Sequence, residues 1–315
     1  MSRKPLPAAA MKNVTLRQLR VFEAVARHLS FSRAAEELHL TQPAVSMQVQ
    51  SLEEIAGLPL TEQIGKKIRL TAAGEEVARQ ARLIAQQLRE AEEAIAAMKG
   101  AEAGRLLIGV VSTAKYFAPA LLAEFARRHP RIELRLTVNN RGAVVKQLTD
   151  NEIDLAIMGS PPRELETVAE VFADHPLVFI ARPDHPLAKQ KRIDSAQLAR
   201  QTLLIREPGS GTRSTLERYL EQQKVSPGDT VEMGSNETIK QAVMAGMGIA
   251  FISEHTIGLE RSVGRITLLN VAGTPVMRQW HLVHRAEKRL LPAAAAFRDF
   301  MRGEAARLIA SQVGL

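Results

Sequence analysis

Three short helical patterns of apolar residues occupy residues 15–56 of the chain. A residue suited to cap a helix N-terminus stands at or near the start of each pattern: Thr15, Ser32 and Thr41. On the third helix, steps of 100° per residue gather one apolar stripe: Val45, Val49, Leu52 and Ala56. The opposite side is uncharged: Pro43, Ser46, Met47 and Gln50. Two helices joined by a tight turn, the second with an uncharged polar face, predict a helix-turn-helix that contacts bases in the major groove of DNA.

The segment after these helices has the pattern of a hairpin. Residues 61–70, TEQIGKKIRL, contain two short β-like runs around Gly65 and Lys66. Lys66, Lys67 and Arg69 would form a basic wing that contacts DNA phosphates without reading the base sequence. An ordinary solvated surface is the alternative for the uncharged helix face, although such a face usually has more Lys and Glu.

A long helix is predicted after Thr71, running without Gly or Pro from about residue 75 to Lys99. Its apolar residues recur at alternating spacings of four and three: Val77, Ala81, Ile84, Leu88, Ala91, Ile95 and Met98. A seam of this kind favours pairing of two helices from two copies of the chain, and a two-fold dimer suits an inverted repeat in DNA. Packing of the stripe on its own chain is the alternative.

From Gly104 onward, apolar runs alternate with helical ones, which predicts two linked α/β lobes with a largely parallel sheet. Ligands collect at the carboxyl ends of parallel strands, where backbone N–H groups are free. Four turns rich in hydroxyl residues follow predicted strands: 111–116, 158–162, 206–213 and 234–238.

The segment 206–213, REPGSGTR, is the sharpest of these turns. Gly209 and Gly211 allow close backbone approach, and the other functional side chains are Arg206, Ser210, Thr212 and Arg213. This combination suits a phosphate or carboxylate. A capped turn without a ligand is the alternative. The segment is not a nucleotide-binding P-loop, because no Gly-Lys-Ser/Thr follows at the needed spacing.

Catalytic and metal-binding motifs are absent from the sequence. There is no HExxH and no GxSxG, and His281 and His284 lie three apart in a predicted strand, on opposite faces. The chain has no cysteine, so disulfides and thiolate metal sites are excluded. We therefore expect neither an enzyme nor a cofactor.

The charge and hydropathy of the chain agree with a DNA-binding protein. The formal net charge is +8, and residues 1–71 hold ten Lys or Arg against six Asp or Glu. A basic balance favours an anionic partner. No apolar run approaches the roughly 20 residues of a membrane-spanning helix, so we expect a cytoplasmic protein without a membrane partner.

Two segments, QLRVFEAVARHLSFSRAAEELHLTQPAVSMQVQSLEE and KKIRLTAAG, resemble LysR-type transcriptional regulators. VSTAKYFAPALLAEFARRHP, ELRLTVNNR, NEIDLAIMGSPP and PGSGTR are similar to the CbbR branch of that family, which controls carbon-fixation operons of the Calvin cycle. The resemblance implies a winged helix-turn-helix over residues 1–71 with residues 1–11 as a disordered arm, a linker helix over 72–103, and a two-lobed, periplasmic-binding-protein-like α/β effector domain over 104–315. It divides that domain into lobe I, about 104–180 plus 278–315, and lobe II, about 181–277.

The resemblance also assigns residues and partners. Base contacts are expected from Gln42, Pro43, Ser46 and Gln50, and phosphate contacts from Thr15, Arg17, Arg33, Lys66 and Lys67. The effector is expected near Ser112, Thr113, Ser160, Thr212, Asn236, Glu237 and Thr238. The implied partners are an interrupted inverted repeat in promoter DNA, a small anionic effector such as a phosphorylated metabolite or NADPH, RNA polymerase, and further copies of the chain in a dimer or homotetramer.

Two departures and two alternatives accompany this interpretation. Thr61 stands where the family usually has Phe, and the ten residues before Met11 exceed the usual start. A LysR-type regulator of another metabolic pathway is the first alternative. A metabolite-binding protein of the periplasmic type is the second, although the N-terminal DNA-binding pattern argues against it.

Overall fold

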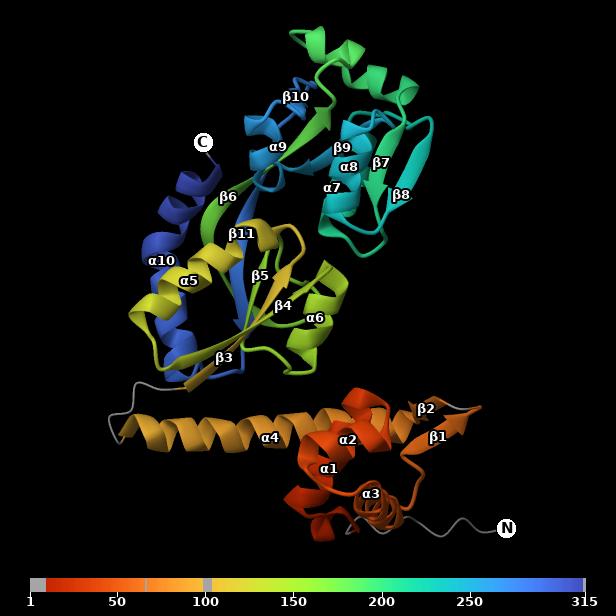
Figure 1. Ribbon diagram of the computed structural model, residues 1–315, viewed down its shortest axis with the longest axis vertical. Helices are drawn as coiled ribbons and strands as arrows, with labels where there is room; N and C mark the ends of the chain where they lie inside the picture. Colours follow the sequence, from red (N-terminus) through yellow and green to blue (C-terminus); the bar gives the residue numbers. More distant parts are fainter. Residues whose placement is uncertain (1–9, 66, 99–103, 314–315) are drawn as a thin grey trace. The chain divides into compact units, whose positions relative to one another are not determined.

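The computed structural model describes residues 10–65, 67–98 and 104–313, and the chain divides into two compact units, residues 1–92 and 93–315 (Figure 1). Lys66 and the end of the predicted linker, residues 99–103, lie outside the described residues. So does most of the predicted arm, apart from Ala10 and Met11 in the 3-10 helix Ala10–Asn13.

The N-terminal unit contains the predicted helices and hairpin. Its elements are α1 (Leu16–His28), α2 (Phe31–Leu38), α3 (Gln42–Ala56), the antiparallel pair β1 (Thr61–Ile64) and β2 (Lys67–Leu70), and the first part of α4 (Ala72–Met98). The turn between α2 and α3 is tight because His39 adopts a left-handed conformation, φ 53°, and ends α2. The core packs α1, α2 and α3 around Phe22, Val45 and Leu52, none of which is exposed.

The helix starts agree with the sequence at three positions and differ at one. Thr15 forms a complete capping box with Gln18, Thr41 accepts from the N–H of Ala44, and Thr71 accepts from the N–H of Gly74. The prediction of Ser32 as the cap of α2 is wrong, because Ser30 accepts from the N–H of Arg33 and the helix begins at Phe31. The earlier start lets Phe31 pack against the core.

A carboxylate anchors the hairpin at the position where the family usually has Phe. Glu53 Oε1 accepts from the backbone N–H of Leu60 at 2.8 Å, and from the N–H and the hydroxyl of Thr61 at 3.0 and 3.2 Å. Thr61 thus holds the wing to α3 by hydrogen bonds instead of apolar contact. Leu60, which is fully buried, fills the core beside it.

The C-terminal unit is built on one nine-stranded sheet in the order β4-β3-β5-β11-β6-β9-β7-β8, with β10 beside β6. Its strands are β3 (Gly104–Val111), β4 (Ile132–Asn139), β5 (Leu155–Met158), β6 (Thr167–Ala181), β7 (Leu203–Arg206), β8 (Thr230–Met233), β9 (Ile249–Ser253), β10 (Thr267–Leu269) and β11 (Val276–Arg285). Its α-helices are the end of α4, α5 (Ala118–Arg128), α6 (Arg141–Thr149), α7 (Gly211–Gln222), α8 (Asn236–Met244), α9 (Gly258–Ser262) and α10 (Pro292–Val313), with 3-10 helices η2 (Ala114–Tyr116), η3 (Pro186–Lys189), η4 (Ser195–Arg200) and η5 (Glu254–Thr256).

The prediction of a largely parallel sheet is correct at the two ends of the sheet and wrong in its middle. Strands β4, β3 and β5 run parallel, as do β8, β7 and β9. The long strands β6 and β11 are antiparallel to each other, and β6 is antiparallel to β9. The chain crosses from the first lobe to the second along β6 and returns along β11, so these two strands must run in opposite directions.

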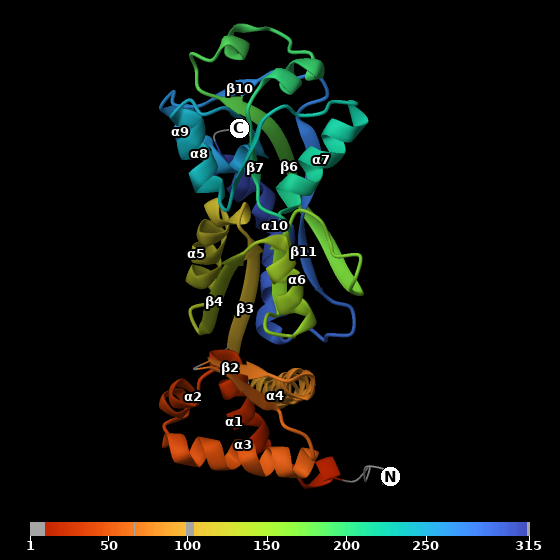
Figure 2. The ribbon, with the colours of Figure 1, turned by 90° about the vertical axis from the view of Figure 1, so that its right-hand side faces the viewer.

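Each lobe has helices on both faces of its part of the sheet. In the first lobe α5 and α10 lie on one face and α6 on the other, and in the second α7 and α8 lie on opposite faces (Figures 1 and 2). Alternation along β6 shows why: Phe179 packs in the cluster with α7, whereas Val178 and Ile180 pack in the cluster with α8. Within β6, Phe172 belongs to the core of the first lobe and Leu177 to the core of the second, so the strand passes from one core to the other between them.

Candidate DNA-binding helix and ligand cavity

Helix α3 exposes the uncharged face that the sequence predicts. Pro43, Met47 and Gln50 are exposed, Ser46 is half-buried, and Met47 reaches 68% exposure. Gln42 Nε2 donates to Ser46 Oγ at 2.9 Å, which orients both side chains on the first turns of the helix. The buried stripe of Val45, Val49 and Leu52 fixes this face outward.

The basic residues that are predicted to contact phosphates are not the ones that form salt bridges within the N-terminal unit. Arg17, Arg33 and Lys67 are exposed, and within residues 10–65 and 67–98 they have no salt-bridge partner. Arg27, by contrast, donates twice to Glu37 at 2.7 Å and holds the pKa of that carboxyl at about 2. The hydroxyl of Thr15 takes part in the capping box. Lys66 is outside the described residues.

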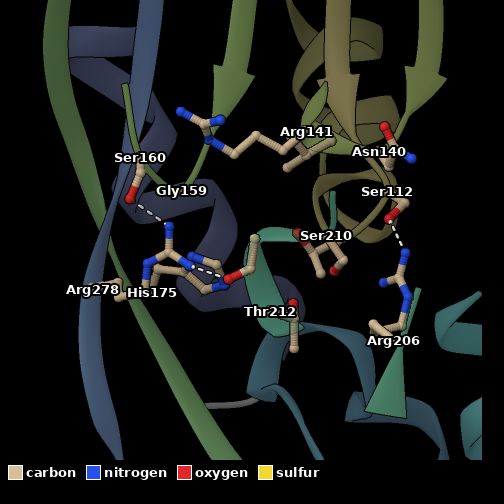
Figure 3. Close-up of a pocket in the computed structure, with 13 residues that line it drawn as sticks. Ser112, Asn140, Arg141, Gly159, Ser160, His175, Arg206, Ser210, Thr212 and Arg278 are labelled. Atoms are coloured by element: carbon tan, nitrogen blue, oxygen red, sulfur yellow. Dashed lines mark hydrogen bonds between the residues drawn. The ribbon is translucent and has the colours of Figure 1, made fainter. Parts of the chain in front are cut away.

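Three of the four predicted strand-end turns meet around a cavity between the two lobes, with about 360 Å³ of space partly open to solvent (Figure 3). The first lobe contributes the ends of β3, β4 and β5, and the second contributes the end of β7 and the N-terminus of α7. The lining residues are Val111, Ser112, Thr113, Asn140, Arg141, Gly159, Ser160, His175, Arg206, Ser210, Gly211, Thr212 and Arg278. Gly211 and Thr212 of the lining belong to the first turn of α7, and the N-terminus of a helix favours an anion.

Arg206 has its charge balanced within the protein. It is 2% exposed, and its guanidinium donates twice to Glu207, at 2.7 and 2.8 Å. It also donates to Asn236 Oδ1 and, across the cavity, to Ser112 Oγ at 3.1 Å (Figure 3). Arg206 therefore links the lobes and has little free charge for a ligand.

Arg278 is the cavity arginine without a carboxylate partner among the described residues. It donates to Ser160 Oγ at 2.5 Å in the first lobe, and to Gly211 O at 3.0 Å and Thr215 Oγ1 at 2.8 Å in α7. Burial, with Arg218 and Arg141 nearby, lowers its pKa to about 10. A half-buried guanidinium with only neutral acceptors attracts an anion strongly, because little else balances its charge.

His175 lies beside Arg278 on the same side of the cavity (Figure 3). It stacks on Trp280 with ring centroids 3.8 Å apart, and it is directly opposite Arg278 in the pairing of β6 with β11. Burial, followed by the charges of Arg278, His255 and His281, holds its pKa well below the ordinary value. The imidazole is accordingly neutral at neutral pH in this structure.

The cavity includes some of the predicted effector residues and leaves others outside. Those that line it are Ser112, Thr113, Ser160, Arg206, Ser210, Gly211 and Thr212. Those outside the lining are Gly209, Arg213, Asn236, Glu237 and Thr238. Arg213 turns away to pair with Glu217 and Glu232, at 2.8 and 2.6 Å, and Asn236 acts behind Arg206 as its acceptor.

Gly159 lies in the predicted turn 158–162, but sequence reasoning missed four polar positions of the lining: Asn140, Arg141, His175 and Arg278. The end of β4 carried a signal, because Asn140 and Arg141 follow a parallel strand just as the predicted turns do. His175 and Arg278 lie inside long strands, where no turn or glycine marks them.

Two further observations limit the chemistry. Within the part of the chain that the structure describes, no cluster of three His, Asp or Glu side chains could hold a metal ion. No helix in those same ranges is long and apolar enough to cross a membrane.

A helix-turn-helix with a basic hairpin, a long helix, and a two-lobed α/β unit with an anion-attracting cavity are the parts of a ligand-responsive DNA-binding regulator. The family models agree: the bacterial regulatory helix-turn-helix protein of the lysR family matches residues 16–75, and the LysR substrate binding domain matches residues 99–306. The chain belongs to the LysR family of transcriptional regulators, and it is a DNA-binding regulator rather than an enzyme.

Individual relatives match over nearly the whole chain. The RuBisCO operon transcriptional regulator of Allochromatium vinosum is 53% identical over 296 residues, covering 94% of this chain and 98% of the relative. A full-length OxyR variant from Pseudomonas aeruginosa is 27% identical with a TM-score of 0.74, covering 94% of this chain and 97% of that one. The regulatory domain of Synechocystis PCC6803 CcmR, in complex with 2-PG, is 39% identical with a TM-score of 0.62, covering 63% of this chain and 96% of that one.

Proposed function

We propose that this protein controls transcription of carbon-fixation operons of the Calvin cycle, binding an interrupted inverted repeat in promoter DNA and responding to a small anionic metabolite. Two features support the DNA-binding part of the proposal. The face of α3 with Gln42, Pro43, Ser46 and Gln50 suits base contacts, and exposed cations of the same unit suit phosphate contacts. The identity of 53% with a RuBisCO operon regulator supports the choice of target genes.

The ligand part of the proposal is based above all on Arg278. Arg278 is half-buried, and its guanidinium has only neutral acceptors among the described residues, which is the arrangement expected of a cation that balances the charge of a bound anion. The hydroxyls of Ser160 and Thr212, and the N-terminus of α7, surround the same space with donors. A phosphorylated metabolite fits this set of donors, and CcmR supports the class because its regulatory domain was solved with 2-PG.

Quaternary structure and partners complete the proposal. Two copies would pair through α4, two dimers would associate into a tetramer, and a ligand would change the geometry of the bound DNA for RNA polymerase. Such a switch is a population shift, so the ligand must prefer one arrangement by about 1 kcal/mol or more. A regulator of another pathway is the second candidate, with the same cavity and a different anion.

DNA binding is tested by footprinting the intact protein on the intergenic region upstream of its operon. We expect protection of an inverted repeat, because α3 from two copies contacts two half-sites. Ser46→Arg places a bulky cation on the base-reading face and should reduce operator affinity more than tenfold. Arg200→Gln, at an exposed site in the C-terminal unit, is the control with unchanged affinity. Equal footprints for the wild type and Ser46→Arg would contradict the assignment of this face.

The effector response is tested with Arg278→Gln and, as its matched control, Arg213→Gln. Both remove one guanidinium near α7, but only Arg278 lines the cavity. Losing a charge-assisted hydrogen bond of about 1.5–3 kcal/mol should weaken binding of 2-phosphoglycolate by roughly ten- to a hundredfold in Arg278→Gln. Arg213→Gln should bind as the wild type does, and both should keep operator binding. Equal losses in the two variants would sink the assignment of Arg278.

A further inference from the structure

His175 is a buried polar side chain without a hydrogen-bond partner at the ligand cavity. It is 2% exposed and lines the cavity, and among the described residues neither Nδ1 nor Nε2 has a partner. Its neighbour His255 differs, because His255 Nδ1 accepts from Trp280 Nε1 at 3.2 Å. Leaving a buried polar group unpaired destabilises the fold, and stacking on Trp280 supplies no hydrogen bond that would offset this loss.

The position of His175 is tied to the anion-attracting Arg278. The two residues are directly paired across β6 and β11, so their side chains lie on the same face of the sheet. Both also approach Gly159: a Cβ atom there would lie 2.7 Å from His175 Nδ1 and 3.2 Å from Arg278 Nη2. Glycine at this strand end therefore lets both groups stand beside Ser160, the hydroxyl that accepts from Arg278.

The charged and titratable groups around His175 are mostly cationic or neutral. Arg278 and His281 face it from β11, and His255 faces it from η5. Asp174 precedes it on β6 and therefore points to the opposite face of the strand. The cavity lining within the described residues contains no carboxylate, and Arg206, the cation across the cavity, is paired with Glu207.

We propose that His175 takes up a proton when an anionic group enters the cavity beside Arg278, so that ligand binding and protonation of His175 are coupled. This inference rests on the proposed function of the cavity as an anion site. A negative charge in a poorly solvated space stabilises an imidazolium strongly, and the protonated ring then donates from a nitrogen that has no other acceptor. The proton comes from solvent, and it returns there when the ligand leaves.

The coupling fixes the sign of a pH effect. In the free protein the pKa of His175 is well below 6.5, and in the complex it is raised. Affinity is therefore greatest at low pH and falls by up to about tenfold per pH unit between the two pKa values of His175, free and bound. Above the pKa of the complex the dependence on His175 disappears.

Proton uptake can be measured by calorimetric titration with 2-phosphoglycolate in buffers of different ionisation enthalpy, at pH values from about 5.5 to about 8, on either side of the ordinary histidine pKa of about 6.5. His175→Gln keeps a polar side chain that does not titrate, and His281→Gln removes a neighbouring histidine outside the cavity lining. The titration of the probe itself is the same in every variant. We expect the wild type and His281→Gln to take up as much as one proton more per ligand than His175→Gln does, at the lower pH values.

Each outcome decides a different point. Equal proton uptake by the wild type and His175→Gln, with affinity reduced equally at every pH, overturns the proposal and assigns His175 a structural role. Absence of binding by the wild type of both 2-phosphoglycolate and inorganic phosphate overturns the anion site and this inference together. If His175→Gln does not fold, as judged by circular dichroism, the pKa of His175 can be followed in the wild type through the NMR resonances of its ring. That pKa must rise when the ligand binds.

Discussion

Gly74 shows how a single residue can fix the joint between the wing and the long helix α4. A Cβ atom on Gly74 would lie 1.9 Å from the carbonyl oxygen of Leu60. That carbonyl accepts from the N–H of Thr71 at 3.1 Å, and the hydroxyl of Thr71 donates to Pro59 O at 2.7 Å. The end of the α3–β1 loop and the first turn of α4 are therefore in direct backbone contact, which only glycine permits.

We expect Gly74→Ala to lower the free energy of unfolding of the N-terminal unit by about 1–3 kcal/mol, the usual cost of overpacking. Gly303 is the matched control: it lies within α10, and a Cβ atom there would meet nothing within 4 Å. Gly303→Ala should raise stability by about 0.5–1 kcal/mol, because alanine favours a helix interior. Thermal unfolding followed by circular dichroism, together with the fluorescence of Trp280 in the C-terminal unit, separates the two effects. An unchanged circular dichroism transition for Gly74→Ala would mean that the Leu60 loop yields without cost.

At the same scale, residue chemistry predicted only part of the cavity. Ser112, Ser160 and Thr212 stand at strand ends, where turn residues and hydroxyls give a local signal. His175 and Arg278 have no such signal, because their role arises from pairing between two strands that are far apart in the sequence. Arg213 had the right chemistry for an anion, but Glu217 and Glu232 compete for its guanidinium. Those partners depend on how α7 packs beside β8, which the spacing of residues does not encode.

At the scale of elements, local rules predicted helices better than the sheet. Caps and apolar stripes are local, so α1, α3 and α4 begin where Thr15, Thr41 and Thr71 predict. Strand direction is a property of the connections. The runs in 167–181 and 276–285 look like the other strands in the sequence, yet they lie at the centre of the sheet and are antiparallel.

The hairpin shows how a contact from a neighbouring helix can replace one that is lost when a residue differs from the family pattern. Thr61 removes the aromatic side chain that the family usually has between wing and helices. Glu53, near the end of α3, supplies three hydrogen bonds to Leu60 and Thr61 instead. This anchoring holds β1 against α3 through polar contacts, so the wing keeps its place beside that helix.

At the scale of the whole molecule, the proposed dimer depends on a stripe of α4 that the described structure leaves uncovered. Val77 packs against the core of its own N-terminal unit, whereas Ile84, Leu88 and Ile95 are 38, 44 and 53% exposed. Three large aliphatic side chains at heptad spacing are costly to leave in water, and a second copy of the helix would cover them. The two sequence alternatives for this stripe therefore apply to different parts of it: Val77 packs internally, and Ile84, Leu88 and Ile95 are available for pairing.

We expect Leu88→Glu to convert the protein to a monomer, because two buried carboxylates would face each other at the centre of the paired helices. Leu88→Met keeps an apolar side chain at the same position and is the control that stays associated. Light scattering during gel filtration measures the mass, and anisotropy of labelled operator DNA measures affinity, which should fall more than tenfold when one helix-turn-helix binds a half-site alone. A Leu88→Glu protein that keeps the wild-type mass would place the interface elsewhere. A protein that becomes monomeric with unchanged affinity would instead show that recognition of the inverted repeat does not need two linked copies.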